Sequence, residues 1–158
     1  MDIREDTYCG LNCGACPIGM ANASGDTEAL ERMANDWGRS AADLRCEGCK
    51  SDSISAFCRD CRIRGCARGR GLEFCFQCDA YPCEVLLSFQ ADEAPHHSAV
   101  LANLEGIRDV GLRVWLAGEE KRWSCPECGL RFGWYSKRCR QCGTELRNAV
   151  TEEKELKA

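Results

Sequence analysis

Hydrophobic side chains recur with a helical period soon after the start of the chain. Asp26 can cap the beginning of this predicted helix, and Gly38 can end it. Beyond it, Ser40 and Asp43 have the spacing of a short capping box. The positions i, i+3, i+4 and i+7 of the helix hold Leu30, Met33, Ala34 and Trp37.

A second helical region follows residue 81. Pro82 suits the first position of a helix, because the N–H that proline lacks is not needed there. A longer amphipathic helix is predicted from about His97 to Val110, and Gly111 should separate it from a third helix. These faces are typical of core-forming helices. Their inward positions hold Val85, Leu86 and Phe89, then Val100, Leu101, Leu104 and Ile107, then Leu112, Trp115, Leu116 and Trp123.

The pattern changes again at the segment WSCPECGLRFGWYSKRCRQCGTEL. It holds two C-x2-C-G motifs around LRFGWYS, a stretch whose composition is typical of a β-strand. This predicts a β zinc ribbon, in which two knuckles share one tetrahedral ion and Gly129 and Gly143 supply positive φ angles. The charged ending EEKELKA is expected to fray. The four predicted ligands are Cys125, Cys128, Cys139 and Cys142.

The remaining cysteines lie where no helix or strand period is visible. The spacing C-x2-C-x4-C occurs twice, with a shift of seventeen residues, and YCGLNCGACP supplies a C-x3-C-x2-C triplet. Irregular backbone of this kind needs a cross-link, which a structural metal provides. These eleven cysteines are Cys9, Cys13, Cys16, Cys46, Cys49, Cys58, Cys61, Cys66, Cys75, Cys78 and Cys83.

The composition favours metal over disulfides as the cross-link. Fifteen cysteines in 158 residues is an odd count, most of them form close C-x2-C pairs, and the start of the chain has no apolar stretch resembling a signal peptide. No apolar run is long enough for a membrane helix, so a cytoplasmic protein without membrane contact is expected. The formal charge is −4, and each four-thiolate site with a divalent ion adds about −2, which disfavours a nucleic-acid partner.

The spacing suggests how the metals could be shared, but it does not decide between partitions. In a sequential partition, one site takes the four cysteines from 46 to 61 and a second takes those at 66, 75, 78 and 83. The seventeen-residue repeat favours interleaved sites instead. With the ribbon, either partition predicts about three to four zinc ions.

The triplet Cys9, Cys13 and Cys16 is then left over. Three thiolates with an open position suit a catalytic or substrate-binding metal, and C-x3-C-x2-C is the spacing with which radical S-adenosylmethionine enzymes hold a [4Fe-4S] cluster. The chain is too short for the barrel of those enzymes. In an alternative zinc site, His96 or His97 would be the fourth ligand.

Basic residues gather in the cysteine-rich region. They could contact phosphate or nucleic acid, but compensation of the anionic thiolate sites is the favoured interpretation. In the predicted ribbon, Phe132, Trp134 and Tyr135 lie beside basic residues and could stack on bases or cover a small core. No nucleophile–base pair or glycine-rich phosphate loop is present, so an enzyme is not favoured. The arginines concerned are Arg59, Arg62, Arg64, Arg68 and Arg70.

The order YCGLNCGACP, CEGCKS and CRDCRIRGCARGRGLEFCFQCDAYPCE resembles a known family. It is an uncharacterised cysteine-rich family, catalogued as a domain of unknown function, number 3795, and common in anaerobic bacteria and archaea. The eleven cysteines from 9 to 83, with Arg64, Gly71 and Pro82, match its pattern, and the resemblance spans roughly residues 7–120. It implies metal binding without an assigned activity, and the predicted ribbon resembles a module appended in some relatives.

Together these patterns predict a small metal-stabilised α+β protein. An irregular cysteine-rich region with short helices (1–95) would precede a helical segment (96–123), a β zinc ribbon (124–150) and a charged tail (151–158). The leading functional hypothesis is a cytoplasmic multi-zinc protein that acts as a binding or adaptor module for a protein partner. One alternative is an iron–sulfur or open-site metalloprotein that uses the N-terminal triplet. A second is a metal-handling protein that passes on a loosely held ion.

Overall fold

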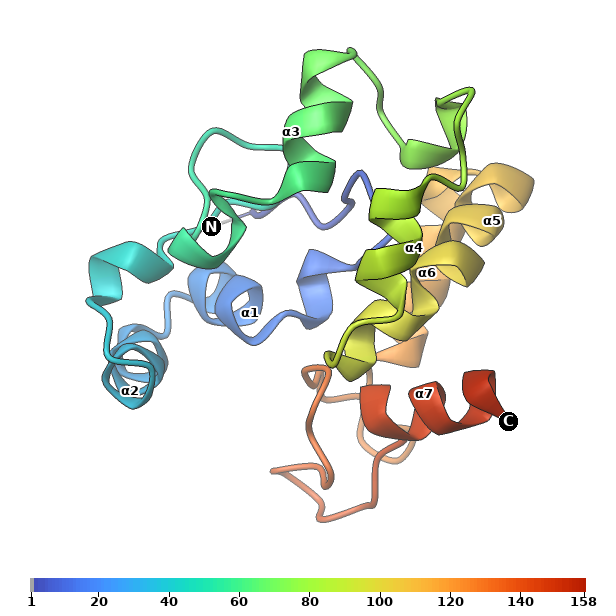
Figure 1. Cartoon of the computed structure of the whole chain (residues 1–158). Helices are drawn as coiled ribbons and strands as arrows, with labels where there is room; N and C mark the ends of the chain where they lie inside the picture. The colour runs from blue at the N-terminus through green and yellow to red at the C-terminus, as the bar shows by residue number, and fades with distance from the viewer. Residues whose placement is uncertain (1) are drawn as a thin grey trace.

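The computed structural model describes residues 2–158 and is built from helices (Figure 1). Among these residues, seven α-helices and five short 3-10 helices are present. The α-helices are α1 (Pro17–Ser24), α2 (Thr27–Asp36), α3 (Arg62–Gly69), α4 (Glu84–Gln90), α5 (Val100–Val110), α6 (Leu112–Arg122) and α7 (Ala149–Lys157). The 3-10 helices are η1 (Cys13–Ala15), η2 (Ala41–Leu44), η3 (Ala56–Cys58), η4 (Cys75–Gln77) and η5 (Pro95–Ala99).

The predicted α+β class with a β zinc ribbon is wrong. In residues 2–158, β pairing is limited to three isolated bridges, and no strand or sheet forms. The segment expected to be a strand bonds to separate parts of the chain: the Phe132 N–H donates to Trp123 O, the Trp134 N–H to Ala15 O, and Trp134 O accepts from Ala149 N–H. Its backbone groups are therefore satisfied without a neighbouring strand.

Several predicted helix ends are confirmed by the local geometry. The Asp26 side chain accepts from the Ala29 N–H at the start of α2, and Ser40 and Asp43 form a capping box at η2. Gly111 has φ +82°, which lets the chain turn between α5 and α6. The long second helix was predicted from about residue 97, but the α-helical part begins at Val100, after η5.

The predicted place of Pro82 in its helix is wrong. Helix α4 begins at Glu84, and Cys83 precedes it in an extended conformation (φ −84°, ψ 163°) as the N-cap. Pro82 therefore lies before the helix. The cysteine that follows it caps α4 with its backbone and turns its side chain towards the central hydrophobic cluster described below.

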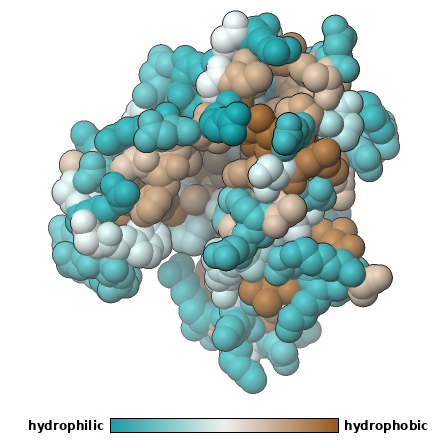
Figure 2. Space-filling view, viewed as in Figure 1, coloured by the Kyte–Doolittle hydropathy of each residue, from teal (hydrophilic) through white to brown (hydrophobic). Residues whose placement is uncertain are grey.

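Three hydrophobic clusters make up the core, and cysteines contribute to each. The central cluster joins α3, α4, α5 and α6, and Leu86, Val100 and Leu104 are fully buried there. The N-terminal cluster joins α1, α2 and η2 around Leu44. The C-terminal cluster surrounds Trp123, with side chains from both halves of the 123–149 segment. Figure 2 shows a mostly hydrophilic face that is hollowed between the part carrying α1 and α2 and the part carrying α4.

Helix α7 packs against η5, so the end of the chain is docked and the expectation that it frays is wrong (Figure 1). Glu152 is 4% exposed and pairs with two guanidinium groups, those of Arg122 and Arg147. Arg122 also pairs with the buried Glu119. A charged sequence can form a docked helix when its inward carboxylate meets partners of opposite charge. None of the helices in residues 2–158 is long and apolar enough to cross a membrane.

Candidate metal centre

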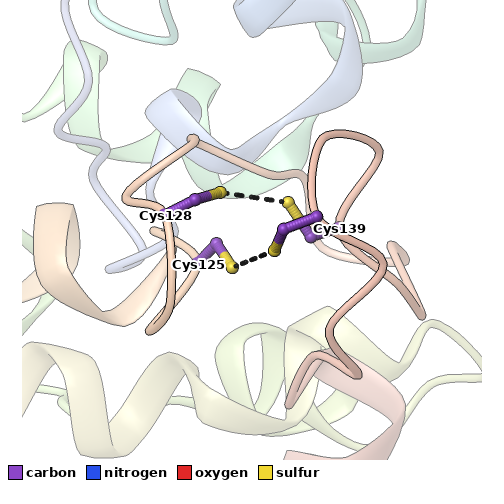
Figure 3. Close-up of side chains that lie close together, drawn as sticks. Cys125, Cys128 and Cys139 are labelled. Atoms are coloured by element: carbon purple, nitrogen blue, oxygen red, sulfur yellow. Dashed lines mark hydrogen bonds between the residues drawn. The ribbon is translucent and has the colours of Figure 1, made fainter.

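Four cysteines near the C-terminus have converging sulfur atoms. Their Sγ atoms all lie within 4.8 Å of one another, and the Cys125–Cys142 and Cys128–Cys139 pairs are each 3.5 Å apart. Figure 3 shows the side chains of Cys125, Cys128 and Cys139 pointing into the space between two loops. Sulfurs bound tetrahedrally to one zinc ion lie about 3.8 Å apart, because each Zn–S bond is about 2.3 Å long. The four thiols therefore fit a single ion.

The two loops have the same backbone hydrogen bonds. The N–H of the first cysteine donates five residues ahead, from Cys125 to Leu130 O and from Cys139 to Thr144 O. The glycine after the second cysteine donates back to the first cysteine's carbonyl in both loops. Gly129 and Gly143 have φ +73° and +75°, which confirms their predicted role. The sequence thus predicted that these four cysteines group together and predicted both knuckle turns, although not the helical context around them.

The electrostatics of this group favour a bound cation. Hydrogen bonding with the Thr144 hydroxyl and amide lowers the pKa of Cys142 to about 6. The Leu130 amide lowers the pKa of Cys128, but burial and the neighbouring thiols outweigh it and raise that pKa to about 12. The Cys142 and Gln141 amides also lower the pKa of Cys139, so the site stabilises some of its thiolates but not all four at once. A divalent ion would replace the protons that keep the other thiols neutral.

The other eleven cysteines are more widely spaced. Within residues 2–158, no second group of three or more cysteine, histidine or carboxylate side chains has its ligand atoms within 4.8 Å of one another. Seven of the eleven nevertheless belong to the hydrophobic clusters or pack against them. Cys9 is buried in the central cluster, with Cys49, Cys61 and Cys75 packed against that cluster. Cys46 is buried in the N-terminal cluster.

The structure divides the predicted N-terminal triplet between different surroundings. Burial, and then the charges of Cys61 and Cys75, raise the pKa of Cys9 to about 11. Burial, and then the charges of Cys58 and Cys46, raise the pKa of Cys16 to about 11. Cys16 packs against the N-terminal and C-terminal clusters, whereas Cys9 lies in the central one. The two ends of the triplet therefore face different sets of cysteines.

Cys13, the middle cysteine of the triplet, has Cys16 and cysteines of the 46–49 segment as neighbours. Burial raises the pKa of Cys13 well above its usual value, and the nearby charges of Cys16, Cys49 and Cys46 add to this effect. The triplet therefore has cysteine neighbours from the later segments of the chain, and which of them share a metal remains a prediction.

A third set of cysteines lies on α3 and in the segment that follows it. Burial, and then the charges of Cys83, Cys66 and Cys78, raise the pKa of Cys75 to about 12. These are the four cysteines of the second predicted sequential site. That they share one metal remains a prediction.

Both histidines have other contacts for their rings. His96 stacks on Trp134 with ring centroids 4.0 Å apart, and its Nδ1 contacts the Tyr135 hydroxyl. His97 stacks on Phe89 at 3.7 Å, and its Nδ1 lies 2.8 Å from the Asp92 carboxylate. These contacts use one nitrogen of each ring to join η5 to its neighbours. A role as fourth metal ligand remains a prediction.

The arginines of the cysteine-rich region divide into two kinds. Arg70 donates to Cys78 Sγ at 3.4 Å, as expected for compensation of thiolate charge, whereas Arg64 donates to the carbonyl oxygen of Cys49 at 2.8 Å. Arg59 and Arg68 pair with Asp43 and Asp52 instead. Arg62 is exposed on α3.

Hydroxyl groups beside the sulfurs were missed by the sequence reasoning. Thr7 Oγ1 lies 3.4 Å from Cys9 Sγ, Ser55 Oγ donates to Cys58 Sγ at 3.8 Å, and Thr144 Oγ1 lies 3.2 Å from Cys142 Sγ. The available signal was a serine or threonine two or three residues from a cysteine. Such groups orient thiolates and stabilise their charge.

Fold and site together define a small helical, cysteine-rich protein with a four-cysteine cluster able to hold a metal ion. The comparison with protein families agrees with the N-terminal cysteine pattern. The chain belongs to the family described as Protein of unknown function (DUF3795), whose model matches residues 6–88, just over half of the chain. No curated protein and no solved structure matches it significantly. The four-cysteine cluster lies outside the matched residues.

Proposed function

We propose that this is a cytoplasmic multi-zinc protein whose metal is mainly structural and which acts as a binding or adaptor module. The observation that carries this proposal is the convergence of the four C-terminal sulfurs within 4.8 Å, a geometry suited to one zinc ion. Four protein ligands leave no open position for a substrate, which favours a structural role over a catalytic one.

The core supports the same role. Cysteines belong to each of the three hydrophobic clusters or pack against them, so metal at these thiols would tie together the segments that meet there. All fifteen cysteines are free thiols. Reduced thiols are what a reducing compartment maintains, and this supports the cytoplasmic part of the proposal.

An iron–sulfur cluster is a second candidate for the N-terminal region, and one observation favours it. Cys61 and Cys75 are near enough to Cys9 for their charges to raise its pKa, yet the three sulfurs do not converge within 4.8 Å. In a cluster each thiolate binds a different iron atom, so the sulfurs lie farther apart than around a single zinc ion. The cluster would then be bound by an interleaved set of cysteines.

Metal analysis of the protein purified without oxygen separates the two candidates. The multi-zinc proposal predicts a colourless sample with about three to four zinc ions per chain and no acid-labile sulfide. A brown sample with about four iron and four sulfide per chain would replace zinc by a cluster in the N-terminal region. About one zinc ion would remain in that case, at the C-terminal site.

A further inference from the structure

A basic cleft lies at the edge of the cysteine-rich region, between η2, the loop before η3, and α3. Its volume is about 590 Å³, and four arginines line it with a single carboxylate, that of Asp52. Three of the four belong to the run of arginines noted in the sequence. The fourth directly follows η2 and joins them only in the folded structure. The four are Arg45, Arg59, Arg64 and Arg68.

Two of these guanidinium groups are held in fixed positions. Arg64 donates to Cys49 O and Ser51 O, both at 2.8 Å, and Arg68 donates to Ser51 O at 3.3 Å and to Asp52 at 2.7 Å. They lie one turn apart on α3 and therefore share a face of the helix. Both side chains bind the 49–52 loop, which positions their remaining N–H groups at the cleft.

The other two arginines form fewer hydrogen bonds and ion pairs with the protein. Among residues 2–158, Arg45 has no ion pair or side-chain hydrogen bond and is exposed. Arg59 approaches Asp43 at 3.7 Å, beyond hydrogen-bond distance. Four guanidinium charges against the carboxylates of Asp52 and Asp43 leave a surplus of two positive charges. Thiolate compensation does not explain Arg45, since no hydrogen bond in residues 2–158 joins its side chain to a sulfur.

We infer that this cleft binds the phosphate group of a small phosphorylated ligand. A phosphate monoester carries close to two negative charges at neutral pH, which equals the surplus, and its three terminal oxygens accept hydrogen bonds from several directions. Guanidinium groups match phosphate in planar, paired geometry, whereas a single carboxylate would leave most of the donors unused.

An aromatic surface beside the cleft indicates what the rest of the ligand could contact. Phe57 is 52% exposed and Trp37 is 46% exposed, with ring centroids 5.2 Å apart. The Arg39 guanidinium lies 4.8 Å from the Phe57 ring centroid, and both Arg39 and Arg59 lower the pKa of Asp43, after the larger effect of Ser40. These rings therefore adjoin the Arg59 side of the cleft and can stack on a planar group.

Calorimetric titration of the full, metal-loaded chain tests the inference. The probes are inorganic phosphate, adenosine monophosphate and adenosine, at low salt because ion pairs are screened. Adenosine monophosphate and phosphate should bind in the micromolar to millimolar range, and adenosine should not. Equal binding of the first two would assign the site to phosphate alone. If adenosine monophosphate binds more tightly than phosphate, and Phe57→Ser reduces its affinity, then the Phe57 ring also contacts the ligand.

Variants of the two arginines with few protein contacts can be compared with a variant of an arginine outside the cleft. Arg45→Gln and Arg59→Gln should each weaken phosphate binding about tenfold, since each removes charge-assisted hydrogen bonds. Arg113→Gln removes an exposed arginine on α6, outside the cleft, and should leave binding unchanged. Metal content and circular dichroism would verify that each variant is folded. Absence of binding by both phosphate probes, or equal effects of Arg113→Gln and Arg45→Gln, would overturn the inference.

Discussion

At the scale of single residues, the thiols of this protein are controlled by burial and by neighbouring hydroxyl and amide groups. Burial raises the pKa of Cys9 and Cys16 to about 11, so without a cation these thiols stay protonated at neutral pH. At the C-terminal site the Thr144 hydroxyl and amide instead lower the pKa of Cys142 to about 6. Cys142 is therefore the thiol most ready to bind a metal first.

Replacing this ligand tests the four-cysteine site. Cys142→Ser should remove about one metal ion per chain, because a closed structural site needs all four thiolates. Elemental analysis of the purified variant measures the loss. A variant that retains the full metal content of the natural chain would show that the four sulfurs do not share an ion.

The neighbouring threonine offers a milder change that leaves the ligand set intact. Thr144→Val keeps four thiolates but removes the hydroxyl that lies 3.2 Å from Cys142 Sγ. Groups that orient metal ligands typically change affinity by about tenfold or more when removed. We therefore expect normal metal content but about tenfold weaker binding in competition with a chelator. Unchanged affinity would assign the hydroxyl to local folding alone.

At the scale of elements, α7 is held by a buried charge network rather than by a wide apolar face. Both oxygens of the Glu152 carboxylate are engaged, with Arg122 and Arg147 as partners. The network continues through Arg122 to Glu119, which also accepts from the Trp123 indole at 3.0 Å. Loss of one partner from such a network leaves a buried charge poorly compensated.

Glu152→Gln should lower the free energy of unfolding by about 2 to 3 kcal/mol, since Arg122 would retain only Glu119 as a charged partner. Glu155→Gln is the matched control on the same helix. Its pair with Arg147 is exposed, so the change should lower the free energy of unfolding much less than Glu152→Gln does. Urea denaturation followed by circular dichroism measures both. Equal losses would show that burial of the Glu152 pair has no special effect.

The contact between η5 and the C-terminal segment should depend on pH. Burial, and then the charge of His97, lower the pKa of His96 to about 3, while the Asp92 carboxylate partly opposes this. Between pH 6.5 and 3 the unfolded chain therefore binds a proton at His96 that the folded chain does not. Stability is fully present above pH 6.5 and falls as the pH decreases, by at most about 1.4 kcal/mol per unit.

His96→Phe tests this dependence and retains a ring to stack on Trp134. The natural chain should lose more stability between pH 7 and 5.5 than the variant does. Metal content must be measured at each pH, because protons also compete for the thiolates. Parallel stability curves for the two proteins at equal metal content would rule out the histidine as the source.

At the scale of the whole molecule, metal removal should affect the regions unequally. Helices α5 and α6 pack on each other and contribute fully or largely buried side chains such as Leu104, Ile107 and Trp115. The segments 46–83 and 123–146 contain most of the cysteines and little regular structure. Their order should therefore depend on metal, as in other small metal-stabilised proteins.

Chelation followed by hydrogen exchange measures this difference. Removing all metal should speed amide exchange in 46–83 and 123–146 first, with the α5–α6 pair protected longest, and should reduce the helical circular dichroism only in part. Restoring zinc should reverse the change. If exchange is unaffected after complete metal removal, the metal does not stabilise the fold.

Much of the local structure could be predicted because it depends on neighbours in the sequence. The cap at Asp26, the capping box at Ser40 and the positive φ at Gly129 all follow from hydrogen bonds or backbone sterics within about five residues. The strand expected at LRFGWYS failed for the opposite reason. Apart from the knuckle bond between Cys125 and Leu130, its backbone partners lie at residues 15, 123 and 149, and no local pattern reveals them.

The sequence by itself predicted a paired-knuckle group of four cysteines able to hold a metal ion and four of the seven α-helices in residues 2–158, because these features depend on short spacings. It did not predict α1, α3 or α7. Only the tertiary structure decided which of the other eleven cysteines are neighbours, how Glu152 became a buried anchor, and how Arg45 joined the arginines of α3 around one cleft. Those outcomes depend on segments distant in the sequence that meet when the three clusters pack.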